Sequence, residues 1–476
     1  MFYMNLDREE KLSLSRQIYR SIKESILSGK LAGGTKLPSS RELSAELHVA
    51  RNVVIEGYEQ LIAEGYAYSK NGSGTYISEG VALPESEYKC DIPQKMAMLN
   101  KPEVLVSFRT GIPDLGLIPM KKWAQIYHKI ALDLQPSQLD YQNTFGEDSL
   151  RVALAQYLNR VRGTKIRPEN ILITNGAAQS FDLLCQLISQ DEYALVENPL
   201  SYGLLHTLES NGVTMQAIRI DQEGMVTEEL PTDPPKLIFT TPSHQFPMGS
   251  IMPAFRRIEL IQYAKSHNAY IVEDDYDSEF RFDGNPVESM QYLAPDRVIY
   301  VGTFSKTLMP ALRIGYMVVP DELRERMREA KFVSDIHSPV LEQLTLAQFI
   351  GSGAFEMHIR KMQKVYQRKR NHLILCLKKS FGDSIHIIGA SAGLHFVCSF
   401  LEIKFDSDLL QKIRQAGIEV SSVDKHLLHP AIHTEYENML IFGYGNTPIE
   451  KMEAGIELLA EMILKDKTNR EKIKES

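Results

Sequence analysis

Five short apolar segments alternate with stretches of helical periodicity in the middle of the chain, and few folds accommodate such an alternation. Each segment is continuous in its apolar residues, as expected of strands that are buried on both faces. Such strands, joined through helices, form a parallel sheet with helices on both sides. The segments are 171–173, 194–196, 237–239, 271–273 and 298–301. The body of the chain is therefore predicted to be a large α/β domain.

A linker precedes this domain. Residues 78–103 lack periodicity and contain three prolines among charged residues, which predicts a linker. The domain is expected to cover residues 104–476, with a long helix at 355–380 and a smaller α+β subdomain from about residue 340 (340–476).

Neither a signal sequence nor an apolar run of membrane-spanning length occurs, so we expect a cytoplasmic protein with no membrane partner. The four cysteines lie far apart, so we expect neither a metal site nor a functional thiol.

The first 77 residues have a different pattern, typical of three helices and a hairpin. Apolar residues at helical spacing predict a helix at 14–28, and Ser39 and Glu42 form a capping box at the start of a second helix. A third helix is expected at 51–64. Two short strands then flank residues 70–74, a turn with glycines at its tip. Residues 1–77 are therefore predicted to form a winged helix-turn-helix.

Charge and helix order suggest DNA as the partner of this N-terminal domain. Residues 11–77 hold nine Lys/Arg and six Glu, a net charge of +3, whereas the formal charge of the chain is −8, which leaves −11 for the rest. The start of the third helix should enter the major groove, the start of the second helix should meet the phosphate backbone, and the wing should approach a neighbouring phosphate. The residues expected at double-stranded operator DNA are Ser40, Arg41, Arg51, Asn52, Val53, Lys70 and Gly72. A helical hairpin with a solvated basic face is the alternative.

The linked motifs of this region resemble the GntR family of bacterial regulators. They are LPSSREL at 37–43, RNV at 51–53, YEQLIAEGY at 58–66 and GSGTY at 72–76. The resemblance covers residues 12–77 and implies DNA binding. Ala50 departs from it, because the family usually has a serine before the arginine, and one phosphate contact or helix cap is expected to be missing.

Three loops of the body carry residues that suit a phosphate-bearing cofactor. Lys306 directly follows an apolar strand, and a partly desolvated lysine beside phosphate-binding groups can form a Schiff base with pyridoxal 5'-phosphate (PLP). Thr303, Ser305 and Arg313 suit the phosphate. Taken alone, this pattern also fits a surface lysine.

Asp274 and Tyr276 follow another strand, where ligands of α/β proteins bind. A carboxylate can keep the PLP pyridine nitrogen protonated, and a hydroxyl can hold its phenolic oxygen. Two acids at a strand end are also typical of a magnesium site or of side chains that face solvent. The third loop joins a strand to a helix and offers free amides to an anion at Ala177, Ala178 and Gln179.

The order and spacing of these motifs resemble the fold-type-I aminotransferases and, together with the N-terminal domain, the MocR/GabR-like regulators. The most specific strings are TPSHQFPMG at 241–249, EDDYDSEF at 273–280 and GTFSK at 302–306. The resemblance implies that Lys306 is the Schiff-base lysine, Asp274 the pyridine partner and Tyr276 the phenolic-oxygen donor. It also implies that Tyr141 reaches the phosphate of the other subunit's cofactor in a homodimer.

Three positions depart from the transaminase pattern. Phe246 replaces the asparagine that holds the phenolic oxygen, and His244 or Gln245 is a candidate substitute. The ring-stacking aromatic is shifted by one residue to Tyr202. Ile441 stands where the family's arginine clamps the substrate carboxylate, and no isoleucine can supply that charge-assisted pair.

These departures favour a regulator over an enzyme, and no residue is nominated as catalytic. We expect a homodimer that binds operator DNA and PLP and whose state a small-molecule effector biases, either an amine or amino-acid-like ligand or PLP itself. A PLP-dependent aminotransferase with an appended DNA-binding domain is the alternative. Replacing Ile441 with arginine is expected to restore binding of some amino acids.

Overall fold

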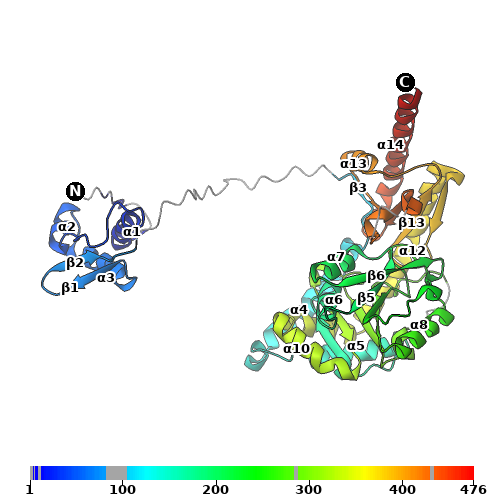
Figure 1. Ribbon diagram of the computed structural model, residues 1–476, viewed down its shortest axis with the longest axis horizontal. Helices are drawn as coiled ribbons and strands as arrows, with labels where there is room; N and C mark the ends of the chain where they lie inside the picture. The colour runs from blue at the N-terminus through cyan, green and yellow to red at the C-terminus, as the bar shows by residue number, and fades with distance from the viewer. Residues whose placement is uncertain are drawn as a thin grey trace. The chain divides into compact units, whose positions relative to one another are not determined.

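The computed structural model describes residues 4, 6–8, 12–81, 104–283, 288–428 and 434–475 (Figure 1). The chain divides into two compact units, residues 1–100 and 101–476, which are treated separately below. Most of the expected linker, residues 82–103, lies outside the described residues. None of the helices in the described ranges combines the length and apolar character needed to cross a membrane.

The N-terminal unit is a winged helix-turn-helix, as the sequence predicts. Its helices are α1 (Leu14–Leu27), α2 (Ser40–Glu46) and α3 (Arg51–Ala63), and its wing consists of β1 (Ala67–Lys70) paired antiparallel with β2 (Gly74–Ile77). The capping box at α2 forms, with both hydrogen bonds between Ser39 and Glu42 present. Buried residues at helical spacing in α1, namely Ile18, Ile22 and Ile26, pack on Val54 and Leu61 of α3. This small core fixes α3 against α1.

The body contains an eight-stranded sheet with the order β4-β11-β10-β9-β8-β5-β6-β7. The five expected segments form β4 (Ile171–Thr174), β5 (Tyr193–Asn198), β8 (Leu237–Thr240), β9 (Tyr270–Asp275) and β10 (Val298–Thr303). Three strands were not predicted from the sequence: β6 (Thr214–Asp221), β7 (Gly224–Met225) and β11 (Gly315–Val318).

The sheet is mixed, which corrects the expectation of a purely parallel one. β11 runs antiparallel to both β4 and β10, and β7 runs antiparallel to β6. β4 and β10 nevertheless point the same way as β9, β8 and β5. β11, with the sequence GYMV, escaped prediction because it begins with glycine, which is unfavourable within a strand. The carboxyl ends of the five predicted strands therefore share one edge of the sheet.

Helices cover both faces of this sheet, because successive residues of a strand point to opposite sides. Val272 of β9 lies in a core shared with α6 (Ala177–Cys185), α7 (Tyr202–Ser210) and α10 (Arg324–Asp335). Its neighbour Ile271 lies in a core shared with α8 (Ala254–Ser266) and α9 (Met290–Leu293). The fold class predicted from the sequence is confirmed in this respect.

The C-terminal part adds a second, smaller sheet. Its strands lie in the order β12 (Ile385–Ile388), β13 (His395–Phe400), β16 (Met439–Gly443) and β15 (Ser421–Ser422), all antiparallel. Around it lie α12 (Ala354–Phe381), α13 (Ser407–Gln415) and α14 (Ile449–Glu475). β14 (Ile418–Glu419) pairs with β3 (Val106–Ser107), so the start of the body also joins this subdomain.

Three helices pack together on the outside of the larger sheet. They are α4 (Met120–Asp133), α5 (Asp148–Val161) and α11 (Val340–Gly351). α11 begins at the expected start of the small subdomain, yet it packs on α4 and α5.

Candidate functional site

A pocket of about 370 Å³ opens at the shared carboxyl edge of the strands, a position typical of ligand sites in α/β sheets. Nine of the eleven cofactor residues predicted from the sequence line it. They are Ala177, Ala178, Tyr202, Asp274, Tyr276, Thr303, Ser305, Lys306 and Arg313. Residues far apart in the sequence thus meet where the resemblance places a PLP site.

Lys306 follows β10 and is held beside the backbone of Gly111. Its Nζ donates a hydrogen bond of 2.8 Å to the Gly111 carbonyl. Gly111 has φ +71°, and a Cβ placed on it would lie 2.5 Å from this Nζ, so a side chain there would displace the lysine. Burial lowers the pKa of Lys306, although the charges of Asp277 and Asp274 oppose this effect. A lysine with a lowered pKa has more of the neutral amine that a Schiff base requires.

Asp274, at the end of β9, faces the pocket with an unsatisfied oxygen. Its Oδ1 is buried and has no hydrogen-bond partner among the described residues. Burial, followed by the charge of Asp275, raises the pKa of Asp274 to about 8. Asp275 is tied away from the pocket by Arg162, whose Nη2 lies 2.7 Å from Oδ2. Asp275 Oδ1 also lacks a partner, but of these two acids only Asp274 lines the pocket, so its free oxygen is the one offered to a ligand.

The expected phosphate site combines a helix start with Arg313. The first turn of α6 leaves the amides of Ala177 and Ala178 without intrahelical partners. Arg313 has φ 52°, an unusual left-handed conformation, and its Nη2 donates 2.6 Å to the Asn175 carbonyl. A Cβ on Gly176 would lie 3.1 Å from this guanidinium. Thr303 donates to Ser305 at 3.0 Å, which brings two hydroxyl groups to the same region.

The residues present fit PLP, because the buried free oxygen of Asp274 matches a protonated pyridine nitrogen and the α6 start matches a phosphate. In such a complex Lys306 would hold the aldehyde carbon, Tyr276 would face the phenolic oxygen and Arg313 the phosphate. PLP supplies an electron sink when it is bound.

Two predicted cofactor residues do not line the pocket. The Gln179 side chain turns away and donates to Asp335 Oδ2 at 2.9 Å, while its Oε1 accepts from Lys331 at 2.8 Å. Tyr141 is 76 % exposed, with its ring 6.2 Å from that of His337. The structure thus leaves Tyr141 accessible on the surface of this chain.

Tyr202 and Phe246 both lie at the pocket, on different elements. Tyr202 is the first residue of α7 and is 52 % exposed, with its ring centroid 4.2 Å from that of His206. Phe246 packs against His395 and His426, whose ring centroids lie 4.9 and 5.1 Å from its own. Either aromatic ring can contact a bound cofactor.

Residues of the small subdomain that sequence reasoning missed close the pocket. They include Leu394, His395 and His426. Burial lowers the pKa of His426 to about 4 and that of His395 well below its ordinary value, so both rings are neutral. Isolated histidines carry no sequence signal, because only the fold brings them to the strand ends.

Ile441 is buried in β16 and does not line the pocket. It has no exposed surface and packs among Val397, Val423, Leu427 and Tyr436. Arg313 is the one arginine among the described residues that line the pocket. The described site therefore has no second guanidinium for a substrate carboxylate.

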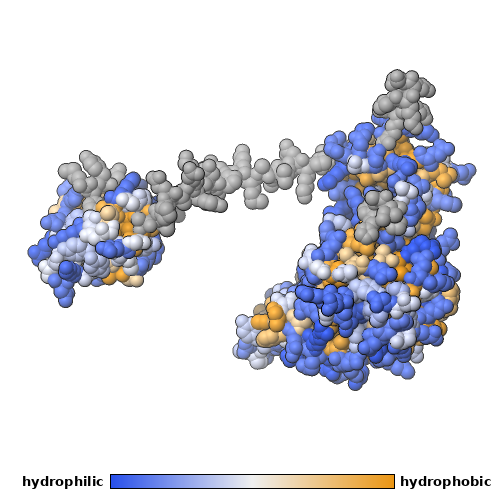
Figure 2. All heavy atoms as spheres, viewed as in Figure 1, coloured by the Kyte–Doolittle hydropathy of each residue, from blue (hydrophilic) through white to orange (hydrophobic). Residues whose placement is uncertain are grey.

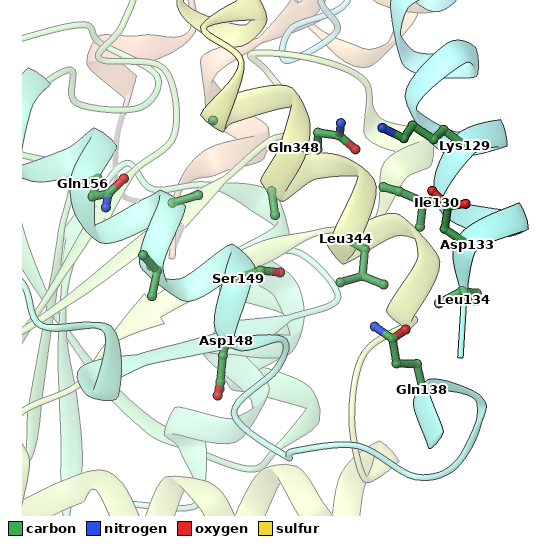
Figure 3. Close-up of a pocket in the computed structure, with 14 residues that line it drawn as sticks. Lys129, Ile130, Asp133, Leu134, Gln138, Asp148, Ser149, Gln156, Leu344 and Gln348 are labelled. Carbon is green, nitrogen blue, oxygen red and sulfur yellow. The ribbon is translucent and has the colours of Figure 1, made fainter. Parts of the chain in front are cut away.

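A larger groove of about 670 Å³ lies between α4, α5 and α11 (Figure 3). Its labelled side chains, among them Lys129, Asp133 and Leu344, come from all three helices. None of the predicted cofactor residues lines this groove.

Most of the predicted DNA-contact residues are exposed on the N-terminal unit. Arg41, Arg51, Asn52, Lys70 and Gly72 are exposed, whereas Ser40 and Val53 are partly buried. Arg51 Nε donates 3.1 Å to Ser40 Oγ, which joins the starts of α3 and α2. Val53 also packs against the core, so it has less surface to offer a base.

Lys36 is a cation of this unit that sequence reasoning missed. Its backbone forms an isolated antiparallel β-bridge with Tyr76 of the wing. Its side chain runs past Gly74, where an added Cβ would lie 2.9 Å from the lysine Cε. Only the fold brings Lys36 beside the wing, so no local sequence signal marks it.

The fold and the site together define a helix-turn-helix regulator whose body is aminotransferase-like. The profile "Bacterial regulatory proteins, gntR family" matches residues 14–77, and "Aminotransferase class I and II" matches residues 104–428. The chain belongs to the MocR-type transcription regulators, in which these two domains are fused. The resemblances to the GntR and MocR/GabR-like proteins are thereby confirmed.

Relatives match the chain over nearly its full length. It is 32 % identical to the probable rhizopine catabolism regulatory protein MocR of Rhizobium meliloti, over 96 % of this chain and 95 % of that protein. It is 29 % identical to the pyridoxine biosynthesis transcriptional regulator PdxR of Corynebacterium glutamicum, over 93 % and 94 %. The body resembles Pyrococcus horikoshii kynurenine aminotransferase, solved in complex with PMP, with a TM-score of 0.70, 26 % identity and coverage of 76 % and 91 %.

Proposed function

We propose that this regulator binds PLP through Lys306 and adjusts its binding to operator DNA in response to a small-molecule effector. The observation that carries the proposal is the unsatisfied buried oxygen of Asp274, which shares a pocket with Lys306. That oxygen calls for a donor such as a protonated pyridine nitrogen. The proposal places the protein in the cytoplasm, where bacterial DNA lies.

The same proposal includes a homodimer that reads two operator half-sites. Figure 2 shows apolar atoms gathered on the body near α4 and α10. The exposed apolar residues of this region include Leu132, Leu139, Tyr141, Phe332 and Val333. A monomeric protein seldom leaves such a group uncovered, which supports an interface there with Tyr141 directed at the partner's cofactor.

The effector is proposed to be an amine, an amino-acid-like ligand or PLP itself. The absence of a second arginine among the described lining residues favours ligands that need no carboxylate clamp. The likeness to PdxR, which regulates pyridoxine biosynthesis, supports PLP as the effector.

Operator affinity is to be measured with and without PLP, and then with PLP plus a panel of amines. A response to PLP alone identifies a vitamin B6 sensor, whereas a response that needs an amine identifies an amine sensor. An affinity that is unchanged in all arms contradicts the proposal.

Replacing Arg51 with Ala is expected to weaken DNA binding more than tenfold at fixed salt. The loss of a base or phosphate contact costs about 1–3 kcal/mol. Arg51 is exposed at the start of α3 and fixed by Ser40. Anisotropy titration of a duplex that the wild type selects from a random pool measures this. Arg20→Ala is the matched control, because Arg20 lies on α1 and pairs with Glu24. Unchanged affinity in the Arg51 variant would remove this residue from the interface.

Turnover of common L-amino acids with 2-oxoglutarate is expected to be negligible. A substrate without a carboxylate anchor is poorly oriented and loses the advantage of a fixed geometry. Ile441 supplies no anchor, and Arg313 is engaged at the phosphate loop. Glutamate formation by the PLP-loaded protein measures this. Sustained multiple turnover would favour the aminotransferase alternative instead.

A further inference from the structure

His244 and Asp277 form a buried pair at the pocket, which Asp277 itself lines. His244 Nδ1 lies 3.0 Å from Asp277 Oδ1, and the two side chains are 1 % and 2 % exposed. Burial alone lowers the pKa of His244, but the charge of Asp277 and the hydrogen bond to it outweigh this, so the pKa is raised. His244 Nε2 lies 3.4 Å from the Gly389 carbonyl, so both ring nitrogens face acceptors. An imidazolium ring, which has two donors, satisfies this arrangement.

On one side the pair contacts Tyr276, which lines the cofactor pocket. The Tyr276 hydroxyl donates 2.9 Å to the His244 carbonyl and lies 3.0 Å from His244 Nδ1. Gln245, the other candidate for the missing asparagine, is engaged elsewhere: its Nε2 donates 2.8 Å to the Pro199 carbonyl. His244 is thus the residue of the two that touches Tyr276.

On the other side the pair contacts the segment 389–394, which leads from β12 to β13 in the small subdomain. The Leu394 amide donates 3.2 Å to Asp277 Oδ2, and Gly389 accepts from His244 as described. A Cβ on Gly393 would lie 2.2 Å from His244 Cε1 and 2.4 Å from Asp277 Oδ2. The segment therefore packs on the pair with no room for a side chain, and a movement of either one displaces the other.

We infer that His244 is the positioning residue that couples the Tyr276 hydroxyl to the 389–394 segment of the small subdomain. The inference rests on the proposed binding of PLP. A bound group that accepts a hydrogen bond from Tyr276 draws the hydroxyl hydrogen away from the His244 carbonyl. The Tyr276 oxygen, 3.0 Å from Nδ1, then shares the Nδ1 hydrogen with Asp277 Oδ1. One connected set of hydrogen bonds then runs from the pocket through His244 to Gly389. Occupancy of the pocket thereby stabilises the small-subdomain segment.

Hydrogen exchange of the full chain with and without PLP tests this coupling. In the wild type, PLP should slow exchange about fivefold both at 389–394 and at the phosphate loop 175–179. In His244→Asn and in Tyr276→Phe, the slowing at 389–394 should fall below about twofold, while the loop stays protected. Tyr276→Phe keeps the ring and serves as the second variant. His267→Asn, at the end of α8 and away from the pocket, is the matched control.

The phosphate loop separates the possible outcomes. Loop protection in the wild type without any change at 389–394 would overturn the coupling and leave PLP binding intact. Full protection of 389–394 in both variants would also overturn it. If PLP protects neither segment of the wild type, the proposed function itself fails, and the inference falls with it.

Discussion

Lys306→Ala is expected to abolish covalent attachment of PLP while the chain remains folded. The wild type should become yellow with PLP, and borohydride should fix the cofactor to the protein. Lys306 Nζ is the amine at the pocket whose pKa burial lowers, and it shares the pocket with Asp274 and its free oxygen. Removing it deletes the nucleophile without opening the main core. Mass spectrometry after borohydride treatment measures the attachment, and circular dichroism checks the fold.

A second lysine provides the control for this experiment. Lys129 lines the groove between α4, α5 and α11 shown in Figure 3, so Lys129→Ala should retain the yellow colour and the covalent mass. Fixed cofactor in the Lys306 variant would show that another amine carries PLP. A colourless wild type would contradict the cofactor proposal as a whole.

Ile441→Arg is expected to lower the free energy of unfolding by about 3 kcal/mol or more, rather than to restore amino-acid binding. The sequence alone suggested restoration, because Ile441 stands where transaminases have their arginine. In the structure this side chain is fully buried among apolar residues, with Val397 and Ser421 as its cross-strand partners. A guanidinium cannot lose its charge in a protein, so it would be buried without a partner or would force the strands apart.

Thermal melting of the PLP-free chain measures this destabilisation. Ile441→Val, which removes one methyl group, should cost only about 0.5–1.5 kcal/mol and is the matched control. A variant that melts like the wild type and whose PLP absorbance shifts with amino acids would show that the arginine reaches the pocket.

Local signals in the sequence were enough to predict the N-terminal unit. The capping box at Ser39 and the glycines of the wing act within a few residues, and both form as expected. The five buried strands were predicted for the same reason, since continuous apolar runs need no long-range information. β6 was missed because it alternates between exposed and buried residues and carries polar side chains.

The candidate site was predictable only where its residues follow strand ends. Asp274 lies at such an end, Lys306 and Ala177 follow one, and the shared edge of the sheet brings the three together. His395 and His426 come from the small subdomain, and their approach to Phe246 depends on how the two sheets pack. The orientation of the Gln179 side chain is set by its hydrogen bonds with Lys331 and Asp335, which are likewise distant in sequence.

The order in which the two functions arise during synthesis follows from where the pocket residues lie in the chain. The pocket is lined from Thr110 to His426, whereas the DNA-binding unit is complete by Ile77. A ribosome that adds roughly 5–20 residues per second needs tens of seconds to make the intervening chain. A newborn molecule can therefore present a folded winged helix well before it has any means of sensing a ligand. Under the proposed function, nascent chains made near their operator would engage DNA in a state that no effector controls.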